Sequence, residues 1–189
     1  MSLSAISLCS KALIKIGTNG MTSFDENTAE ARVASQLYGM VRDGLLSSYP
    51  WRFATAQKEL NCLVDGPTAD YEYAFALPSD LLRILCAGEG HRGNGLTYRV
   101  CENVLQTNSR CVTLTYIFRP QEESFPPFFD ELLVSKLAAE FCLPLTESTA
   151  RSEFLNKQTE SLLSRAKLID AQQATTIGLD RFSLIGVRG

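Results

Sequence analysis

The first fifty residues place apolar side chains at the spacing of two amphipathic helices. In the first helix, over residues 4–16, the apolar positions are Ile6, Cys9, Leu13 and Ile16. Gly17 then stands where a C-terminal cap belongs. In the second, the stripe is Val33, Leu37, Val41 and Leu45. This helix starts near Asn27 or Thr28 and should end by Tyr49, because Pro50 disfavours helix at the residue before it.

Two arginines of the second helix lie off its apolar stripe. Arg32 and Arg42 are therefore expected to face water. The ten residues between the two helices exceed the usual helix-turn-helix connection, and no cluster of basic or amide side chains marks a recognition face. Sequence-specific DNA binding is not predicted.

The middle of the chain changes to a period of two, which is typical of half-buried strands. Strands are predicted over residues 71–77, 82–87, 96–100, 104–106 and 110–118. Pro78 ends the first of them. Only short breaks separate the strands, so antiparallel neighbours are expected rather than parallel crossovers.

The final third returns to helical spacing. One helix is predicted between the Pro126–Pro127 pair and Pro144, since proline suits the first turn of a helix and the position after its end. Thr146 or Ser148 caps a second helix. Its heptad positions are Leu155, Leu162 and Ile169. Both helices are expected to pack with the first two.

These elements predict an α+β fold that is mainly helical. A body of about four helices comprises residues 1–60 and 120–173, and a small antiparallel β lobe is inserted at residues 61–119. An extended C-terminal arm follows at residues 174–189.

The C-terminal arm is unusually apolar for the end of a chain. Its large apolar residues are Ile177, Leu179, Phe182, Leu184, Ile185 and Val187. Gly178 and Gly186 work against a helix there. Burying each apolar side chain is worth roughly 1.5–3 kcal/mol, so a docking place is expected. Two interpretations are open: the arm packs on its own domain, or it binds another subunit or a partner.

Composition and charge exclude several classes of protein. The 189 residues are 45% hydrophobic and 21% charged, which is ordinary for a soluble domain. A net charge of −3 argues against a dedicated nucleic-acid binder. No apolar run reaches the length of a membrane span, and the N-terminal pattern is not that of a signal peptide. An intracellular, soluble protein is predicted.

Cysteine and histidine provide no recognisable chemistry. The six cysteines are Cys9, Cys62, Cys86, Cys101, Cys111 and Cys142. No CxxC pair occurs, and the single histidine, His91, cannot complete the usual zinc patterns. Structural roles within apolar patterns are predicted for the cysteines, with no disulfides, no metal and no cofactor.

Two short motifs suggest chemistry that their context does not support. Residues 88–93 match G-x-G-x-x-G, but a strand follows instead of a phosphate-binding helix, so a hairpin loop is predicted. His91 could pair with Cys86 or Cys101 as a nucleophilic couple, yet no orienting group is apparent. No catalytic residue is predicted from either motif.

Two further features have competing interpretations. The carboxylate pairs Asp25-Glu26 and Glu122-Glu123 lie in predicted turns, where solvated charge is expected instead of a glycosidase pair.

Trp51-Arg52-Phe53 forms an aromatic cluster between the helices and the lobe. A core hinge is the first interpretation, and an interface that uses Trp51 and Phe53 is the alternative.

Several short motifs occur in order along nearly the whole chain. They are Ala5, Ala12, Leu13, Ile16 and Gly17 in the first helix; Trp51-Arg52-Phe53; the tyrosine-rich stretch Tyr71 to Leu77 with Pro78, Asp80 and Arg83 after it; the helix Pro126 to Cys142; the helix Ser148 to Asp170; and the arm Ile177 to Gly189. In this order they resemble the tail tubular protein A family, the head-to-tail adaptors of short-tailed phages.

The resemblance implies a structural protein of a phage or prophage virion, without catalysis or cofactor. Helices would form the collar of a twelve-fold ring below the portal protein, the arm would reach onto portal subunits, and the β lobe would face the nozzle protein of the tail. The expected location is the virion neck, and the host cytoplasm during assembly. Twelve copies would carry a charge of about −36, which suits a channel through which DNA slides without specific binding.

Two other functions remain open from the sequence. One is a virion-associated cell-wall hydrolase that would use a turn carboxylate such as Glu123. The other is an unrelated, non-catalytic interaction module whose arm folds back onto its own body.

Overall fold

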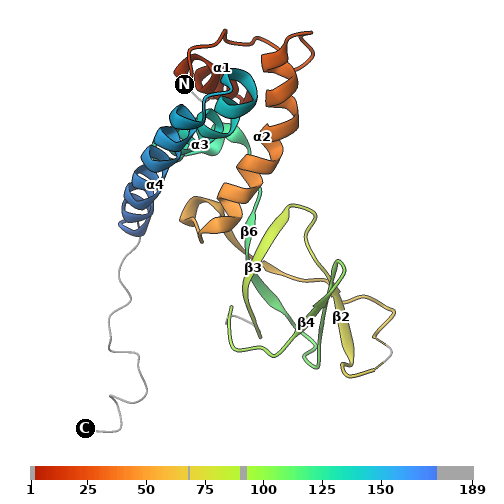
Figure 1. Ribbon diagram of the computed structural model, residues 1–189. Coiled ribbons are helices and arrows are strands. Elements are labelled where there is room, and N and C mark those ends of the chain that lie inside the picture. The colour runs from red at the N-terminus through yellow and green to blue at the C-terminus, as the bar shows by residue number, and fades with distance from the viewer. Residues whose placement is uncertain (1–2, 68, 90–92, 174–189) are drawn as a thin grey trace, which may run out of the picture.

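Four α-helices and two small antiparallel sheets make up the part of the chain that the computed structural model describes, residues 3–67, 69–89 and 93–173. In chain order the elements are α1 (Ala5–Lys15), α2 (Ala29–Ser48), the 3-10 turn η1 (Arg52–Ala54), β1 (Thr55–Glu59), β2 (Tyr73–Ala76), β3 (Leu81–Gly88), β4 (Arg99–Cys101), β5 (Val104–Thr107), β6 (Thr113–Phe118), the 3-10 turn η2 (Glu122–Ser124), α3 (Pro127–Thr146) and α4 (Thr149–Ala171). The predicted α+β class, with helices before and after an inserted lobe, is confirmed (Figure 1).

Side-chain caps explain where three of the helices begin. Ser4, Thr28 and Ser148 each precede a helix, and each side-chain oxygen accepts a hydrogen bond from the backbone N–H three residues later. Gly17, with a φ of +83°, follows the end of α1 in the left-handed conformation that favours glycine. The predicted helix starts are therefore confirmed to within a residue or two.

Helix α3 is the centre of the helical body. It packs against α1, α2 and α4, and most of its residues are apolar, which suits a central helix. Its fully buried side chains include Phe129, Leu132, Leu133, Leu137 and Phe141. Figure 1 shows α3 between α1, α2 and α4.

Helix α3 does not end at Pro144 as predicted. Pro144 lies inside the last turn, and the helix continues to Thr146. A proline there removes one backbone hydrogen bond, which a last turn tolerates. Glu147 then closes the helix in the left-handed conformation, with a φ of +53°, and its N–H donates to the carbonyl of Leu143 at 3.0 Å.

The β lobe consists of two three-stranded sheets, ordered β1-β6-β3 and β2-β5-β4. All four strand pairs are antiparallel, as predicted. The lobe starts earlier than the predicted boundary at residue 61, because β1 pairs with β6. The sequence of β1, Thr-Ala-Gln-Lys-Glu, is mostly polar and half-exposed or exposed, so apolar alternation could not reveal it. Strand β4 is shorter than predicted and begins at Arg99.

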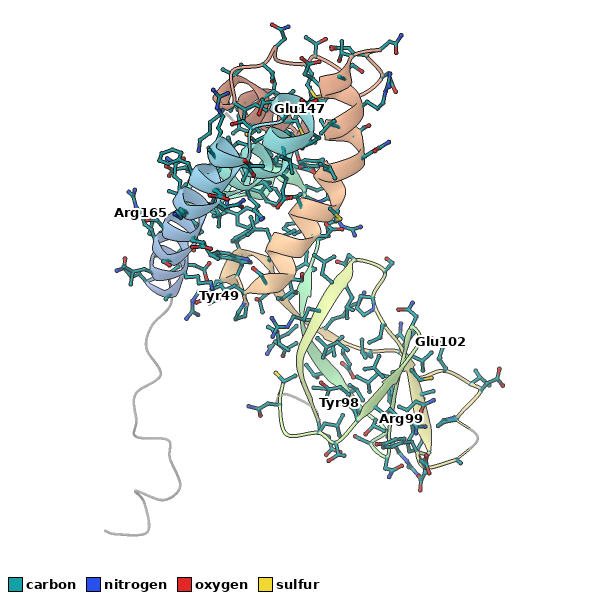
Figure 2. All side chains as sticks on the ribbon, in the orientation of Figure 1. Tyr49, Tyr98, Arg99, Glu102, Glu147 and Arg165 are labelled. Atoms are coloured by element: carbon teal, nitrogen blue, oxygen red, sulfur yellow. The ribbon has the colours of Figure 1, made fainter. Side chains whose placement is uncertain are left out.

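Two hydrophobic cores meet at the junction of body and lobe. The lobe has a core of its own, which includes Phe75, Leu105 and Leu114. Ile117 of β6 belongs to the core of the body, and Leu82 and Leu85 of β3 pack against that core. In Figure 1 the lobe lies beyond the lower end of α2, and Figure 2 places Tyr98, Arg99 and Glu102 on the lobe, away from the helices.

Candidate interaction site

An aromatic cluster fills the junction between α2 and the lobe. Trp51 is fully buried, and its indole Nε1 donates to the carbonyl of Leu45 at 3.0 Å. Its ring meets Tyr49 at a centroid distance of 4.9 Å and Phe129 at 5.4 Å, both edge-on. The core interpretation therefore applies to Trp51, whose side chain has no exposed surface for a partner. Phe53 is half-buried against Phe129, with centroids 4.9 Å apart.

The last turn of α4 is attached to the same junction. Asp170 is 1% exposed, and its two carboxylate oxygens lie 3.1 and 3.2 Å from the backbone nitrogen of Arg52, which donates to them. Burial raises the pKa of Asp170, and the hydrogen bond from Arg52 opposes that rise. Lys167 places its ammonium 5.3 Å from the centre of the Tyr49 ring. Figure 2 shows Tyr49 between the ends of α2 and α4, whereas Arg165 points outward.

A polar cluster joins α2 to η2. Arg42 lies 2.8 Å from Glu122 and 2.9 Å from Asp43, and the hydroxyl of Tyr38 donates to Glu122 at 3.0 Å. The Arg42 side chain is only 16% exposed, so the prediction that it faces water is wrong. Arg32 is exposed as predicted. The sequence could not show the Arg42 contact, because its partner lies 80 residues away.

The ionisation of this cluster follows from its contacts. Partial burial opposes the charged form of Glu122, but hydrogen bonds from its own backbone, from Arg42 and from Tyr38 outweigh burial and lower its pKa. Burial, followed by the negative charge of Glu122, raises the pKa of Tyr38. Solvated charge was predicted for the Glu122-Glu123 pair, and this is wrong for Glu122 and right for the exposed Glu123.

The other predicted carboxylate pair lies in a turn before α2. Glu26 accepts hydrogen bonds from the backbone nitrogens of Thr22 and Ser23 and from the Thr22 hydroxyl. The Thr22 hydroxyl has the largest effect on Glu26 and lowers its pKa. Glu26 therefore organises this turn.

Residues of the Pro78-Asp80-Arg83 motif attach the lobe to α2. The guanidinium of Arg83 donates to the carbonyl of Ser47, in the last turn of α2, at 3.0 Å. The carbonyl of Asp80 accepts from the backbone N–H of Arg119 at 2.9 Å. Arg119 in turn forms an ion pair with Asp43. Body and lobe are thus held together by specific polar contacts as well as by packing.

An open apolar groove lies between α2 and α4, with α3 as its floor. The cavity has a volume of about 390 Å³. Met40 and Gly44 line it from α2, Leu132 from α3 and Leu163 from α4. Of the two glycines inside α2, Gly44 lines the groove and Gly39 does not. A Cβ added at Gly44 would meet nothing within 4 Å.

The six cysteines and the metal-binding side chains are the remaining groups whose placement was predicted. All six cysteines are free thiols; Cys9 and Cys142 are buried, whereas Cys62, Cys101 and Cys111 are exposed, contrary to the prediction that most pack as small hydrophobes. Burial raises the pKa of Cys9 to about 12. Over residues 3–67, 69–89 and 93–173, no group of three acidic, histidine or cysteine side chains could hold a metal ion.

Several predicted features lie outside the described residues. They are the arm residues Ile177, Leu179, Phe182, Leu184, Ile185 and Val187, together with His91 and the centre of the 88–93 loop. Cys86 and Cys101, the two thiols considered as partners of His91, lie in different sheets.

Where the structure describes helices, none combines the length and the hydropathy of a membrane span. No protein-family model matches the chain, and no curated protein matches it.

Proposed function

We propose that the chain is a structural assembly protein of a short-tailed phage or prophage, a ring-forming adaptor that joins the portal to the tail. The helical body forms the collar of the ring, and the β lobe faces the nozzle protein. The apolar arm, residues 177–187, binds the portal. No step of this function requires a catalytic site or a cofactor.

The observation that carries the proposal is the attachment of the segment before the arm. Asp170, in the last turn of α4, is held by the backbone of Arg52, so the arm starts from a fixed point on the body. A connector needs a rigid platform and a segment that reaches a partner, because only the segment then has to be ordered on binding. The contacts of Arg83 and Arg119 give the lobe a defined orientation on the same platform.

The motif residues behind the family resemblance also have distinct positions in the fold. Gly17 follows α1, Trp51 anchors the aromatic junction, and Arg83 binds the end of α2. Trp51 and Arg83 each connect two elements, and Gly17 ends a helix, so these motif residues have structural roles in the architecture.

The full-length protein mixed with its cognate portal ring tests the proposal. Native mass spectrometry should detect a complex with twelve adaptor chains. Replacing Leu184 and Ile185 together by Asp should weaken binding by roughly a hundredfold or more, because two buried apolar side chains are lost. Ser183→Asp is the control, since it adds a negative charge within the same segment without removing an apolar side chain.

Two outcomes would contradict the proposal. Portal binding that is unchanged in the Leu184→Asp/Ile185→Asp variant would remove the arm from the mechanism. Clearing of peptidoglycan by the wild-type protein in a zymogram, lost in Glu123→Gln, would instead support the hydrolase alternative.

A further inference from the structure

We infer that the α2–α4 groove is the resting place of the C-terminal arm of the same chain, occupied before a partner takes the arm. The exposed lining of the groove is mostly apolar, and the groove is open to solvent. Met40, on its α2 wall, leaves 64% of its surface exposed. A methionine exposed at the edge of an apolar groove is typical of a surface that receives another apolar segment.

The position and length of the arm fit this groove. Helix α4 forms one wall through Asn156, Glu160 and Leu163, and the same helix ends at Ala171, from which the rest of the chain continues. From Ala171 back to Asn156 the helix covers about 23 Å at its usual rise. The fourteen residues from 174 to 187 span up to about 46 Å when extended, so a chain that reverses after α4 can follow the whole groove.

The apolar content of the arm matches the mostly apolar lining of the groove. Six large apolar side chains occur within residues 177–187, interrupted by Gly178 and Gly186. Glycines at these positions allow the chain to approach the helices closely and to change direction. Burial of these side chains opposes the entropic cost of ordering the segment. The balance between the two is small, so a stronger partner can displace the arm from the groove.

Charges at the rim complement a charge in the arm. Lys136 and Glu140 form an ion pair with each other at 2.6 Å. Glu160, on the α4 wall of the groove, has no ion-pair partner among the described residues. Arg181 stands in the middle of the apolar segment, and it lies within reach of Glu160 once the chain has turned back.

Tethering favours the arm of the same chain over that of a second copy. Only a few residues separate the end of α4 from Ile177, so the effective concentration of the arm at the groove is on the order of 1 mM. A second copy at micromolar concentration competes poorly with such a tether. The arm of the free protein therefore occupies its own groove.

Trypsin cleavage after Arg181 in the full-length chain, without any partner, tests this inference. Gly44→Trp fills the groove from α2, and its new side chain has open space. It should speed release of residues 182–189 by roughly tenfold, because cleavage follows the population of the undocked arm. Gly39→Trp is the matched control: it lies on the same helix with the same open space, does not line the groove, and should cleave like the wild type.

A second variant keeps the inference falsifiable if Gly44→Trp does not fold. Glu160→Arg reverses the charge that faces Arg181 and should also speed cleavage. Gln158→Arg is the control, because Gln158 is an exposed position of α4 that does not line the groove, and it should cleave like the wild type. Equal rates in the wild type and the groove variants would overturn the inference. Protection that grows with protein concentration would also overturn it, in favour of a second copy. The trypsin experiment uses the free protein, so a failure of the portal-binding experiment does not affect its outcome. A failure of the trypsin experiment likewise leaves the proposed portal binding untouched.

Discussion

Arg119 and Asp43 lie 76 residues apart in the sequence and form a two-point ion pair, with Nε 3.1 Å from Oδ1 and Nη2 2.5 Å from Oδ2. Arg119 directly follows β6, and Asp43 belongs to α2. The pair therefore connects the strand that leaves the lobe to a helix of the body. Because Asp43 also accepts from Arg42, one carboxylate organises two guanidinium groups at this junction.

We predict that Asp43→Asn lowers the free energy of unfolding by about 1 kcal/mol at pH 7. Partial burial opposes ionisation of Asp43, but hydrogen bonds from Arg119 and Arg42 outweigh burial and lower its pKa. A lowered pKa stabilises the fold above the unfolded-state value near 4, and the stabilisation is lost as the pH falls through the folded-state value. Urea unfolding should therefore show the difference between wild type and variant shrinking from pH 7 toward pH 3.

Asp65→Asn is the control for this prediction, since Asp65 is an exposed carboxylate of the lobe. It should change stability by less than about 0.5 kcal/mol at either pH. A difference between Asp43→Asn and wild type that does not depend on pH would contradict the ionic role of Asp43.

Asp130→Asn should stabilise the protein at neutral pH. Burial raises the pKa of Asp130 to about 6, with Lys11 opposing, and its Oδ1 is buried without a hydrogen-bond partner. The carboxyl of Asp130 ionises near pH 4 in the unfolded state but only near pH 6 in the folded state. The free energy of unfolding therefore falls as the pH rises from about 4 to about 6. Asn removes that loss, so thermal unfolding at pH 7 should show a gain of about 1 kcal/mol after allowance for solvent screening.

The gain from Asp130→Asn should disappear below pH 4, where the carboxyl is protonated in both states. Glu131→Gln, at the neighbouring exposed position, is the control and should be neutral. A variant that is less stable than wild type at pH 7 would show instead that the carboxylate has a favourable partner in solution.

Asp170→Ala should cost about 1–3 kcal/mol, because it removes the buried carboxylate that accepts from the backbone N–H of Arg52. Asp170→Asn retains an acceptor oxygen and should restore most of the loss. Hydrogen exchange of the last turn of α4 should increase in the Ala variant and less in the Asn variant. Equal exchange in wild type and Asp170→Ala would contradict the role of this contact in holding the end of α4.

The helices could be predicted because each has local signals. Ser4, Thr28 and Ser148 are side-chain caps, and Gly17 adopts the left-handed conformation after α1, so helix bounds are encoded within a few residues of where they occur. Strand β1 lacks such a signal, because its pairing with the distant β6 stabilises a polar segment.

The contacts at the junction could not be predicted for a related reason. Arg42 binds Glu122 from 80 residues away, and Asp170 binds Arg52 from 118 residues away. Helical periodicity shows which residues leave the apolar face, but it does not show which polar partner another element brings to them. Trp51 is the exception, since a large aromatic residue beside Pro50 already indicated a core anchor.

Phe154→Ser tests whether the proposed ring uses the outer face of α4. Phe154 and Leu168 leave 66% and 61% of their surfaces exposed on this helix, and a ring requires each subunit to present a face that its neighbour covers. Loss of the exposed Phe154 ring should change the free energy of unfolding by less than about 0.5 kcal/mol. It should nevertheless reduce the number of chains that assemble on a portal. Lys58→Ser, at an exposed position of β1, should assemble like wild type. Native mass spectrometry counts the chains, and full rings formed by Phe154→Ser would exclude this face from the subunit contact.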